Sequence, residues 1–220
     1  MGWYCLERGQ GRPLVLLHGI GMSHTAWTPV MDLLARERRV LAFDIAGFGQ
    51  TPALTGALST ERLLQGLQDS LSERGISGPV DIVGNSMGGW LALAAAHAGL
   101  ARSMVGISPA GLGDKVLAIP VSIRSHRMPV SAMNRAIDDF AHAPGFEATY
   151  DIIDRIPELD RLTLPITIAF GRLDWILTGA MQNRAGLPAQ ARWLQPWGWG
   201  HVPMWDDPEG VARVILDGTR

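Results

Sequence analysis

The chain has 220 residues, a hydrophobic content of 47% and a net charge of −2 at neutral pH. These values suit one folded domain with a full core and exclude an intrinsically disordered chain. The Lys and Arg residues are scattered along the sequence, which argues against nucleic acid as a partner. The single cysteine, Cys5, cannot form an intramolecular disulfide, and without a C-x-x-C pair no thiolate zinc site is expected.

The N-terminal sequence MGWYCLERGQ lacks the basic and then apolar pattern of a secretory signal peptide. The longest apolar stretch, residues 91–107, is too short to cross a bilayer and is interrupted by His97 and Arg102. We therefore expect a cytoplasmic protein without a membrane partner. The oligomeric state is left open.

Short apolar runs that end in Gly, Ser or another turn residue predict strands buried on both faces. In chain order these strands are expected at 13–19, 39–47, 79–86, 102–110, 164–171 and 191–196. Helical patterns alternate with them at about 27–36, 60–74, 87–98 and 207–217. The alternation predicts an α/β fold with a mostly parallel sheet.

Residues 111–163 break this alternation between two predicted strands. The segment has a helical composition that is interrupted by Pro120, Pro129, Pro144 and Pro157. We interpret it as an insertion above the strand ends, within a single domain of residues 1–220.

The sequence GNSMG at 84–88 places Ser86 on a tight turn between a predicted strand and a predicted helix. A serine on such a strained turn needs small neighbours two positions away, and Gly84 and Gly88 meet that need. The G-x-S-x-G spacing therefore predicts a nucleophile at the carboxyl end of the sheet, where ligands bind in open α/β folds. The alternative is that Ser86 only caps the helix that follows.

A serine hydroxyl becomes a strong nucleophile only when a base removes its proton, and a histidine base needs an acid to fix its tautomer. Asp174 follows the run 164–171, and His201 lies in a glycine-rich loop after the run 191–196. Singly, either residue could be an ordinary loop residue. Together with Ser86 they predict a Ser-His-Asp triad with one member after each of three strands.

From LVLLHG (14–19) to GHVPMWDDPE (200–209), the chain resembles the α/β-hydrolase fold superfamily, in particular its serine esterases, with a shortened cap. The resemblance implies a mostly parallel central sheet with helices on both faces and a small helical cap. It also implies that the N–H groups of Ile20 and Met87 form the oxyanion hole. In this pattern His18 shapes the loop and does not act as the base.

The sequence DIAGFGQT (44–51) resembles a further loop of the superfamily, in which Asp44 would accept backbone N–H groups. For the substrate pocket we expect contributions from His24, Trp27 and Trp175, although tryptophans more often serve packing.

The expected function is that of a serine carboxylesterase that cleaves short-chain carboxylic esters through an acyl-enzyme, without a metal or organic cofactor. The same triad also serves carbon–carbon bond hydrolases, perhydrolases and hydroxynitrile lyases, and a non-catalytic ligand-binding protein is a further alternative. Relatives with an aspartate nucleophile are disfavoured because Ser86 occupies that position.

Overall fold

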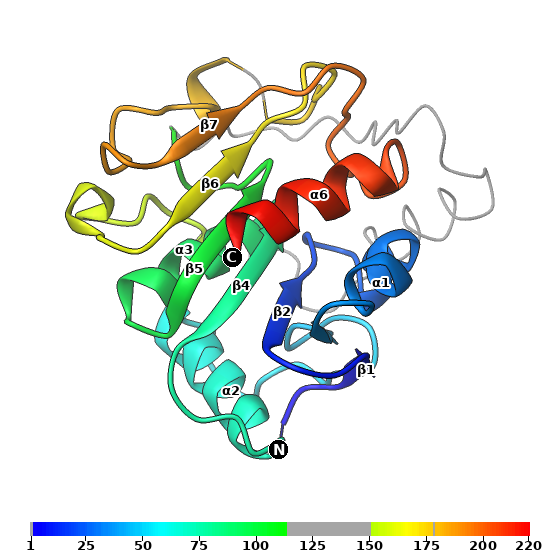
Figure 1. Cartoon of the computed structure of the whole chain (residues 1–220). Coiled ribbons are helices and arrows are strands. Elements are labelled where there is room, and N and C mark those ends of the chain that lie inside the picture. The colour runs from blue at the N-terminus through cyan, green and yellow to red at the C-terminus, as the bar shows by residue number, and fades with distance from the viewer. Residues whose placement is uncertain (1, 114–150, 178) are drawn as a thin grey trace.

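The computed structural model describes residues 2–113, 151–177 and 179–220. Within these residues the chain forms a seven-stranded sheet of order β1-β3-β2-β4-β5-β6-β7 (Figure 1). β1 pairs antiparallel with β3, and all other neighbours pair parallel. The strands are β1 (Cys5–Arg8), β2 (Pro13–Leu17), β3 (Arg39–Phe43), β4 (Val80–Asn85), β5 (Ala101–Ile107), β6 (Ile166–Ala169) and β7 (Arg192–Leu194). The α/β fold expected from the sequence is confirmed.

Helices cover both faces of the sheet (Figure 1). Val15 and Leu17 of β2 pack in one hydrophobic cluster with α2 and α3, whereas Leu14 and Leu16 pack in a second cluster with α1 and α6. Successive strand residues are therefore buried on opposite faces, which explains why the strands are continuous apolar runs. The described helices are η1 (His24–Trp27), α1 (Thr28–Leu34), α2 (Thr60–Ser72), α3 (Met87–His97), η2 (Leu159–Arg161), η3 (Gly179–Met181) and α6 (Pro208–Gly218).

The two edge strands differ most from the sequence-based expectation. β1 was not predicted, because its sequence CLER is half-buried to exposed and lacks the apolar run of the inner strands. It pairs Cys5 with Phe43 and Arg8 with Val40 at the edge of the sheet. β7 at the opposite edge is shorter than the predicted run 191–196.

Most of the predicted insertion, residues 114–150, lies outside the described residues. The parts of the insertion that the structure describes at its two ends, 111–113 and 151–163, meet at Trp90 of α3. Trp90 donates a hydrogen bond from its indole N–H to the carbonyl of Asp154 at 2.9 Å. A Cβ on Gly111 would lie 2.6 Å from the Trp90 ring and 3.0 Å from the Asp154 carbonyl oxygen. Both ends therefore pack on the helix that begins after Ser86.

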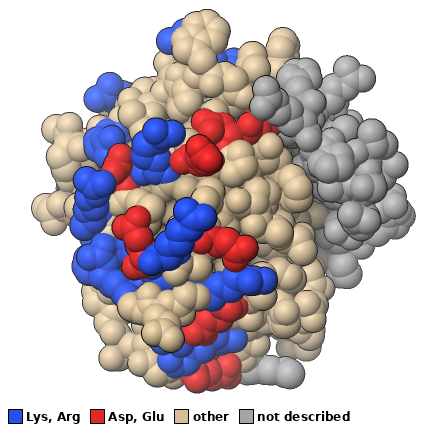
Figure 2. Space-filling view, turned by 45° about the vertical axis from the view of Figure 1, so that its right-hand side comes forward, with Lys and Arg blue, Asp and Glu red and all other residues tan. Residues whose placement is uncertain are grey.

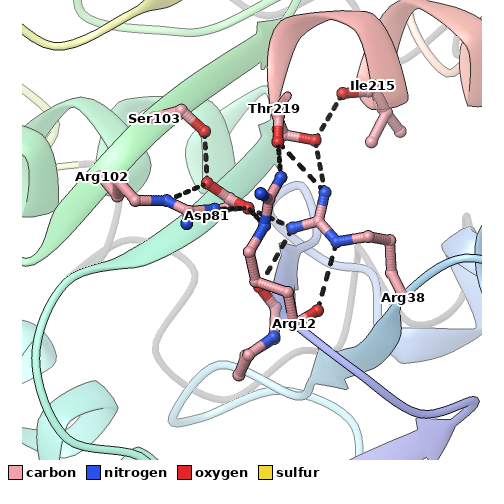
Figure 3. A network of polar contacts seen from close by, with 8 residues as sticks. Arg12, Arg38, Asp81, Arg102, Ser103, Ile215 and Thr219 are labelled. Atoms are coloured by element: carbon pink, nitrogen blue, oxygen red, sulfur yellow. Dashed lines mark hydrogen bonds and ion pairs between the residues drawn. The ribbon is translucent and has the colours of Figure 1, made fainter.

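A cluster of charged side chains lies at the amino ends of the inner strands (Figure 3). Asp81 of β4 is fully buried, and its carboxylate accepts hydrogen bonds from Arg12 at 3.1 Å, from Ser103 at 2.7 Å and from Arg38. Arg102 donates to both carboxylate oxygens of Asp81, at 3.1 and 2.5 Å. Three guanidinium groups from three segments of the chain thus converge on one buried carboxylate.

The same cluster holds the end of α6. Arg38 donates to the carbonyl of Thr219 at 3.2 Å and to its hydroxyl at 2.9 Å, and Arg12 also donates to this carbonyl. The Thr219 hydroxyl donates in turn to the carbonyl of Ile215 at 2.9 Å. The carbonyl of Thr219, just after α6, therefore has two cationic partners, a placement that complements the negative end of the helix dipole.

On the face that Figure 2 shows, basic and acidic side chains lie side by side, without a large patch of one sign. Ion pairs at the surface of the described residues include Arg8–Asp32 at 3.4 Å and Arg39–Glu7 at 2.7 Å. Among the described helices, none combines the length and the hydrophobicity that crossing a bilayer requires.

Candidate active site

Ser86 lies between β4 and α3 with φ 54° and ψ −117°, a conformation that a non-glycine residue adopts only under strain. Its carbonyl accepts the N–H groups of Trp90 and Ala110, both at 3.0 Å. Its side chain makes no capping hydrogen bond to α3. The helix-cap alternative therefore does not explain why a serine stands at this strained position.

The glycines around Ser86 permit close backbone contacts. A Cβ on Gly84 would overlap the carbonyl of Gly88, and a Cβ on Gly88 would overlap the carbonyl of Leu17 at the end of β2. A Cβ on Gly19 would lie 3.2 Å from the Ser86 Cβ. The loop after β2 therefore lies directly against the serine.

Asp174 and His201 form the hydrogen-bonded pair that the sequence predicts. The Asp174 Oδ2 lies 3.0 Å from the His201 Nδ1, and the Asp174 side chain has no exposed surface. The other oxygen, Oδ1, accepts the N–H groups of Ile176 at 2.9 Å and Leu177 at 3.0 Å. Because a carboxylate only accepts hydrogen bonds, His201 carries its proton on Nδ1, and Nε2 is free to act as a base.

The pKa of Asp174 lies below its usual value. Burial by itself raises this pKa, but the nearby His201 and the hydrogen bonds from His201 and Leu177 lower it more. Asp174 is therefore ionised at neutral pH and accepts the hydrogen bond from His201.

The three loops that carry Ser86, Asp174 and His201 are bound to one another. The Asn85 amide donates to the carbonyl of Ile107 at 3.0 Å and to that of His201 at 2.8 Å. The N–H of Leu173, next to Asp174, donates to the carbonyl of Trp199 at 3.0 Å. Among the described residues no hydrogen bond joins the Ser86 hydroxyl to His201 directly. The sequence analysis did not single out Asn85, since the carbonyls that it binds belong to distant residues.

The loop after β2 is held by His18, as the resemblance implies. His18 donates from Nδ1 to the carbonyl of Gly19 at 2.7 Å, and its Nε2 accepts the N–H of Ile45 at 3.0 Å. Burial lowers the pKa of His18 to about 4, so the ring is neutral. Within the described part of the chain, the backbone N–H groups of Ile20 and Met87 have no acceptor.

Asp44 organises the loop 44–51. Its Oδ2 accepts the N–H of Gln50 at 2.8 Å, and its Oδ1 accepts the N–H and the Nδ1 proton of His24. His24 is therefore a partner of Asp44 with a side chain that is 14% exposed. Trp27 is fully buried in the cluster on the face of α1 and α6, so it serves packing, whereas Trp175 is 67% exposed beside Asp174.

The described residues contain no cluster of three or more His, Cys, Asp or Glu side chains that could hold a metal ion.

Comparison with known proteins shows the family and the fold. The sequence model of a family described as "Alpha/beta hydrolase family" matches residues 14–214. The 2-hydroxy-6-oxo-6-(2'-aminophenyl)hexa-2,4-dienoic acid hydrolase of Metapseudomonas resinovorans is 38% identical over 112 residues, which cover 49% of this chain and 39% of that protein. The chain thus spans about two fifths of the length of that relative.

Two solved structures share the fold over nearly the whole chain. A thermophilic esterase from Thermogutta terrifontis matches with a TM-score of 0.79 and 20% identity, over 97% of this chain and 91% of that one. A serine hydrolase involved in carbazole degradation matches with a TM-score of 0.80 and 25% identity, over 97% and 93% of the two chains.

Proposed function

The chain belongs to the alpha/beta hydrolase family, and on this basis we propose that it is a serine hydrolase with Ser86 as nucleophile, His201 as base and Asp174 as orienting acid. The observation that carries this proposal is the 3.0 Å hydrogen bond between His201 and a buried Asp174, in loops bound to the strained Ser86 turn. A neutral imidazole with its proton on Nδ1 presents Nε2 as the acceptor that a serine nucleophile requires.

In the proposed reaction His201 Nε2 takes the Ser86 proton as Oγ attacks the substrate carbonyl. The N–H groups of Ile20 and Met87, together with the positive end of the α3 dipole, stabilise the negative oxygen of the tetrahedral intermediate. His201 then returns the proton to the leaving alcohol, and a water molecule activated in the same way releases the acid from Ser86. Loss of one such oxyanion donor typically costs about 100-fold or more in rate.

We propose carboxylic esters with short acyl chains as the substrates. The fold is shared with a thermophilic esterase, and the short insertion at 111–163 supports a pocket that buries few acyl methylenes, each of which contributes about 0.8 kcal/mol. In a series of p-nitrophenyl esters, kcat/KM should be highest for short acyl chains. A steady rise toward long chains would contradict this preference.

Cleavage of a carbon–carbon bond is the second candidate. It is favoured by the 38% identity with the hydrolase from Metapseudomonas resinovorans, whose name describes a dienoic acid substrate. The wild-type protein and Ser86→Ala should be assayed in parallel on p-nitrophenyl acetate and on a 2-hydroxy-6-oxo-dienoate.

The ratio of the two wild-type activities decides between the candidates. Both activities should disappear in Ser86→Ala, because the proposed nucleophile is then lost. A fluorophosphonate should label Ser86 and no other serine. An adduct on a different serine would refute the assignment of the nucleophile, and equal turnover by Ser86→Ala would refute a serine hydrolase altogether.

A further inference from the structure

We propose that Asp206 is a positioning residue for His201, and this inference rests on the proposed role of His201 as base. Two consecutive carboxylates, Asp206 and Asp207, lie at the end of the loop 195–207 that carries His201, which we call the histidine loop. The Asp206 Oδ2 accepts the N–H of Gly200 at 2.8 Å. This bond closes the loop on itself, from the residue before His201 to a residue five positions after it.

The backbone of His201 is thereby held on both sides. Asp206 accepts a hydrogen bond from the N–H of Gly200, the residue before His201, and Asn85 donates to the carbonyl of His201 itself at 2.8 Å. The fit at Gly200 is close, since a Cβ there would lie 3.1 Å from the Asp206 Oδ2. With Asp174 bound to the ring, three hydrogen bonds from three parts of the chain fix the position of the imidazole.

Asp207 differs from Asp206 in what it binds. Its Oδ1 accepts the N–H of Gly210 at 3.0 Å and caps α6, and its Oδ2 accepts the indole N–H of Trp199 at 3.0 Å. Loss of a helix cap acts on stability. Both carboxylates therefore contact the loop that carries His201, but only Asp206 binds the backbone next to His201, whereas Asp207 binds the start of α6 and the Trp199 side chain.

Removing the Asp206 carboxylate leaves the Gly200 N–H without this acceptor and allows the loop to shift. A shift of about 1 Å in a catalytic group can lower the rate by about 100-fold. Asp206→Ala should therefore lower kcat by at least about tenfold with little change in KM, because Asp206 is proposed to act through the position of His201 and not on the substrate. Asp206→Asn keeps a carbonyl oxygen that accepts the Gly200 N–H, so it should restore most of the rate.

The rate at which a fluorophosphonate labels Ser86 tests the inference without knowledge of the natural substrate. This labelling rate should be measured for the wild-type protein and for three single variants, Asp206→Ala, Asp206→Asn and Asp207→Ala. It should also be measured for Asp174→Asn and for the double variant that combines Asp174→Asn with Asp206→Ala. We expect slow labelling for Asp206→Ala, near wild-type labelling for Asp206→Asn, and a lowered Tm without a comparable loss of rate for Asp207→Ala. In the Asp174→Asn background Asp206→Ala should cost little more, because the base is already misoriented.

Two results would overturn the positioning role: labelling of Asp206→Ala at the wild-type rate, or an equal loss of rate in both backgrounds. If Asp206→Ala does not fold, Asp206→Glu replaces it, since it keeps the charge but displaces the carboxylate by one methylene. Asp206→Glu should then label slowly, and a wild-type rate would refute the proposal. Absence of labelling in the wild-type protein would overturn the proposed function itself, an outcome distinct from a failure confined to the Asp206 variants.

Discussion

At the scale of single residues, the hydrogen bonds of Asp174 determine what an isosteric substitution would do. In Asp174→Asn, the amide oxygen would replace Oδ1, because the N–H groups of Ile176 and Leu177 require an acceptor there. The amide NH2 would then face His201 Nδ1, which would have to accept, and the imidazole proton would move to Nε2. We expect kcat to fall by about 10⁴-fold with a small change in Tm.

Asp207→Asn is the matched control for this prediction. Its effect should be mainly on stability, since Asp207 caps α6 and binds Trp199. Loss of one such bond corresponds to about 1 kcal/mol in the free energy of unfolding. Steady-state kinetics and thermal unfolding of both variants check the assignment, and a larger loss of kcat in Asp207→Asn would reverse it.

Short motifs were sufficient to place Ser86, Asp174 and His201 after β4, β6 and β7, because each follows an apolar run that ends in a recognisable turn. Asn85 could not be assigned in the same way. The partner of Asn85 is 116 positions away in the sequence, so no local spacing indicates the contact. Side chains that bind backbone groups across a fold have no motif of their own.

At the scale of elements, the contact between α3 and β2 depends on Gly88. A Cβ there would overlap the carbonyl groups of Leu17 and His18. Because these are backbone atoms, no side-chain rotation can relieve the overlap. Gly88→Ala should therefore lower the free energy of unfolding by about 3 kcal/mol and displace Ser86. Gly99, just after α3, is a useful control, because it has φ +76° but open space around it. Gly99→Ala should cost about 1 kcal/mol and leave activity unchanged.

Urea denaturation of the two glycine variants measures this difference directly. If Gly99→Ala were the more damaging change, the conformation of the backbone would matter more than the contact with β2.

The inner elements were predictable to within a few residues, because strands buried on both faces are continuous apolar runs. The strand expected at 79–86 corresponds to β4 (Val80–Asn85), and the helix expected at 87–98 corresponds to α3 (Met87–His97). The edge strand β1 was not predictable, since its partial burial depends on β3, which lies far along the chain. A local sequence pattern does not predict a strand whose burial comes from pairing with a strand that is distant in the sequence.

At the scale of the whole molecule, the parallel strands separate two clusters of polar side chains. The candidate active site lies at the carboxyl ends of the inner strands, and the Asp81 cluster lies at their amino ends (Figure 3). α6 connects the two ends, since Asp207 caps its start beside the His201 loop and Arg38 binds Thr219 at its end. We therefore expect substitutions in the Asp81 cluster to change stability and not catalysis.

Asp81→Asn tests this separation. It leaves three guanidinium groups without their shared counter-ion, and Arg38 among them is only 6% exposed. Breaking a buried ion pair in this way costs about 3–5 kcal/mol, whereas Asp32→Asn, at an exposed pair with Arg8, should cost less than about 1 kcal/mol. Both variants should keep the wild-type kcat/KM at a temperature where they are folded. A large loss of kcat/KM in folded Asp81→Asn would show that the two ends are coupled.

The contribution of Asp81 should also depend on pH. Burial by itself raises the pKa of Asp81, but the hydrogen bonds from Arg102 and Ser103 and the charge of Arg38 outweigh it, so the net pKa lies below its usual value. A carboxyl group with a depressed pKa stabilises the folded state above its unfolded pKa of about 3.9, and this contribution disappears as pH falls through the lower, folded pKa. The difference in unfolding free energy between wild type and Asp81→Asn should therefore be full at pH values above about 4 and shrink steadily below. Because Asp174 titrates in both proteins, its own effect cancels in this difference. Urea titrations of both proteins across this range provide the measurement, and a difference that stays constant down to about pH 2 would mean that Asp81 is not the group that titrates.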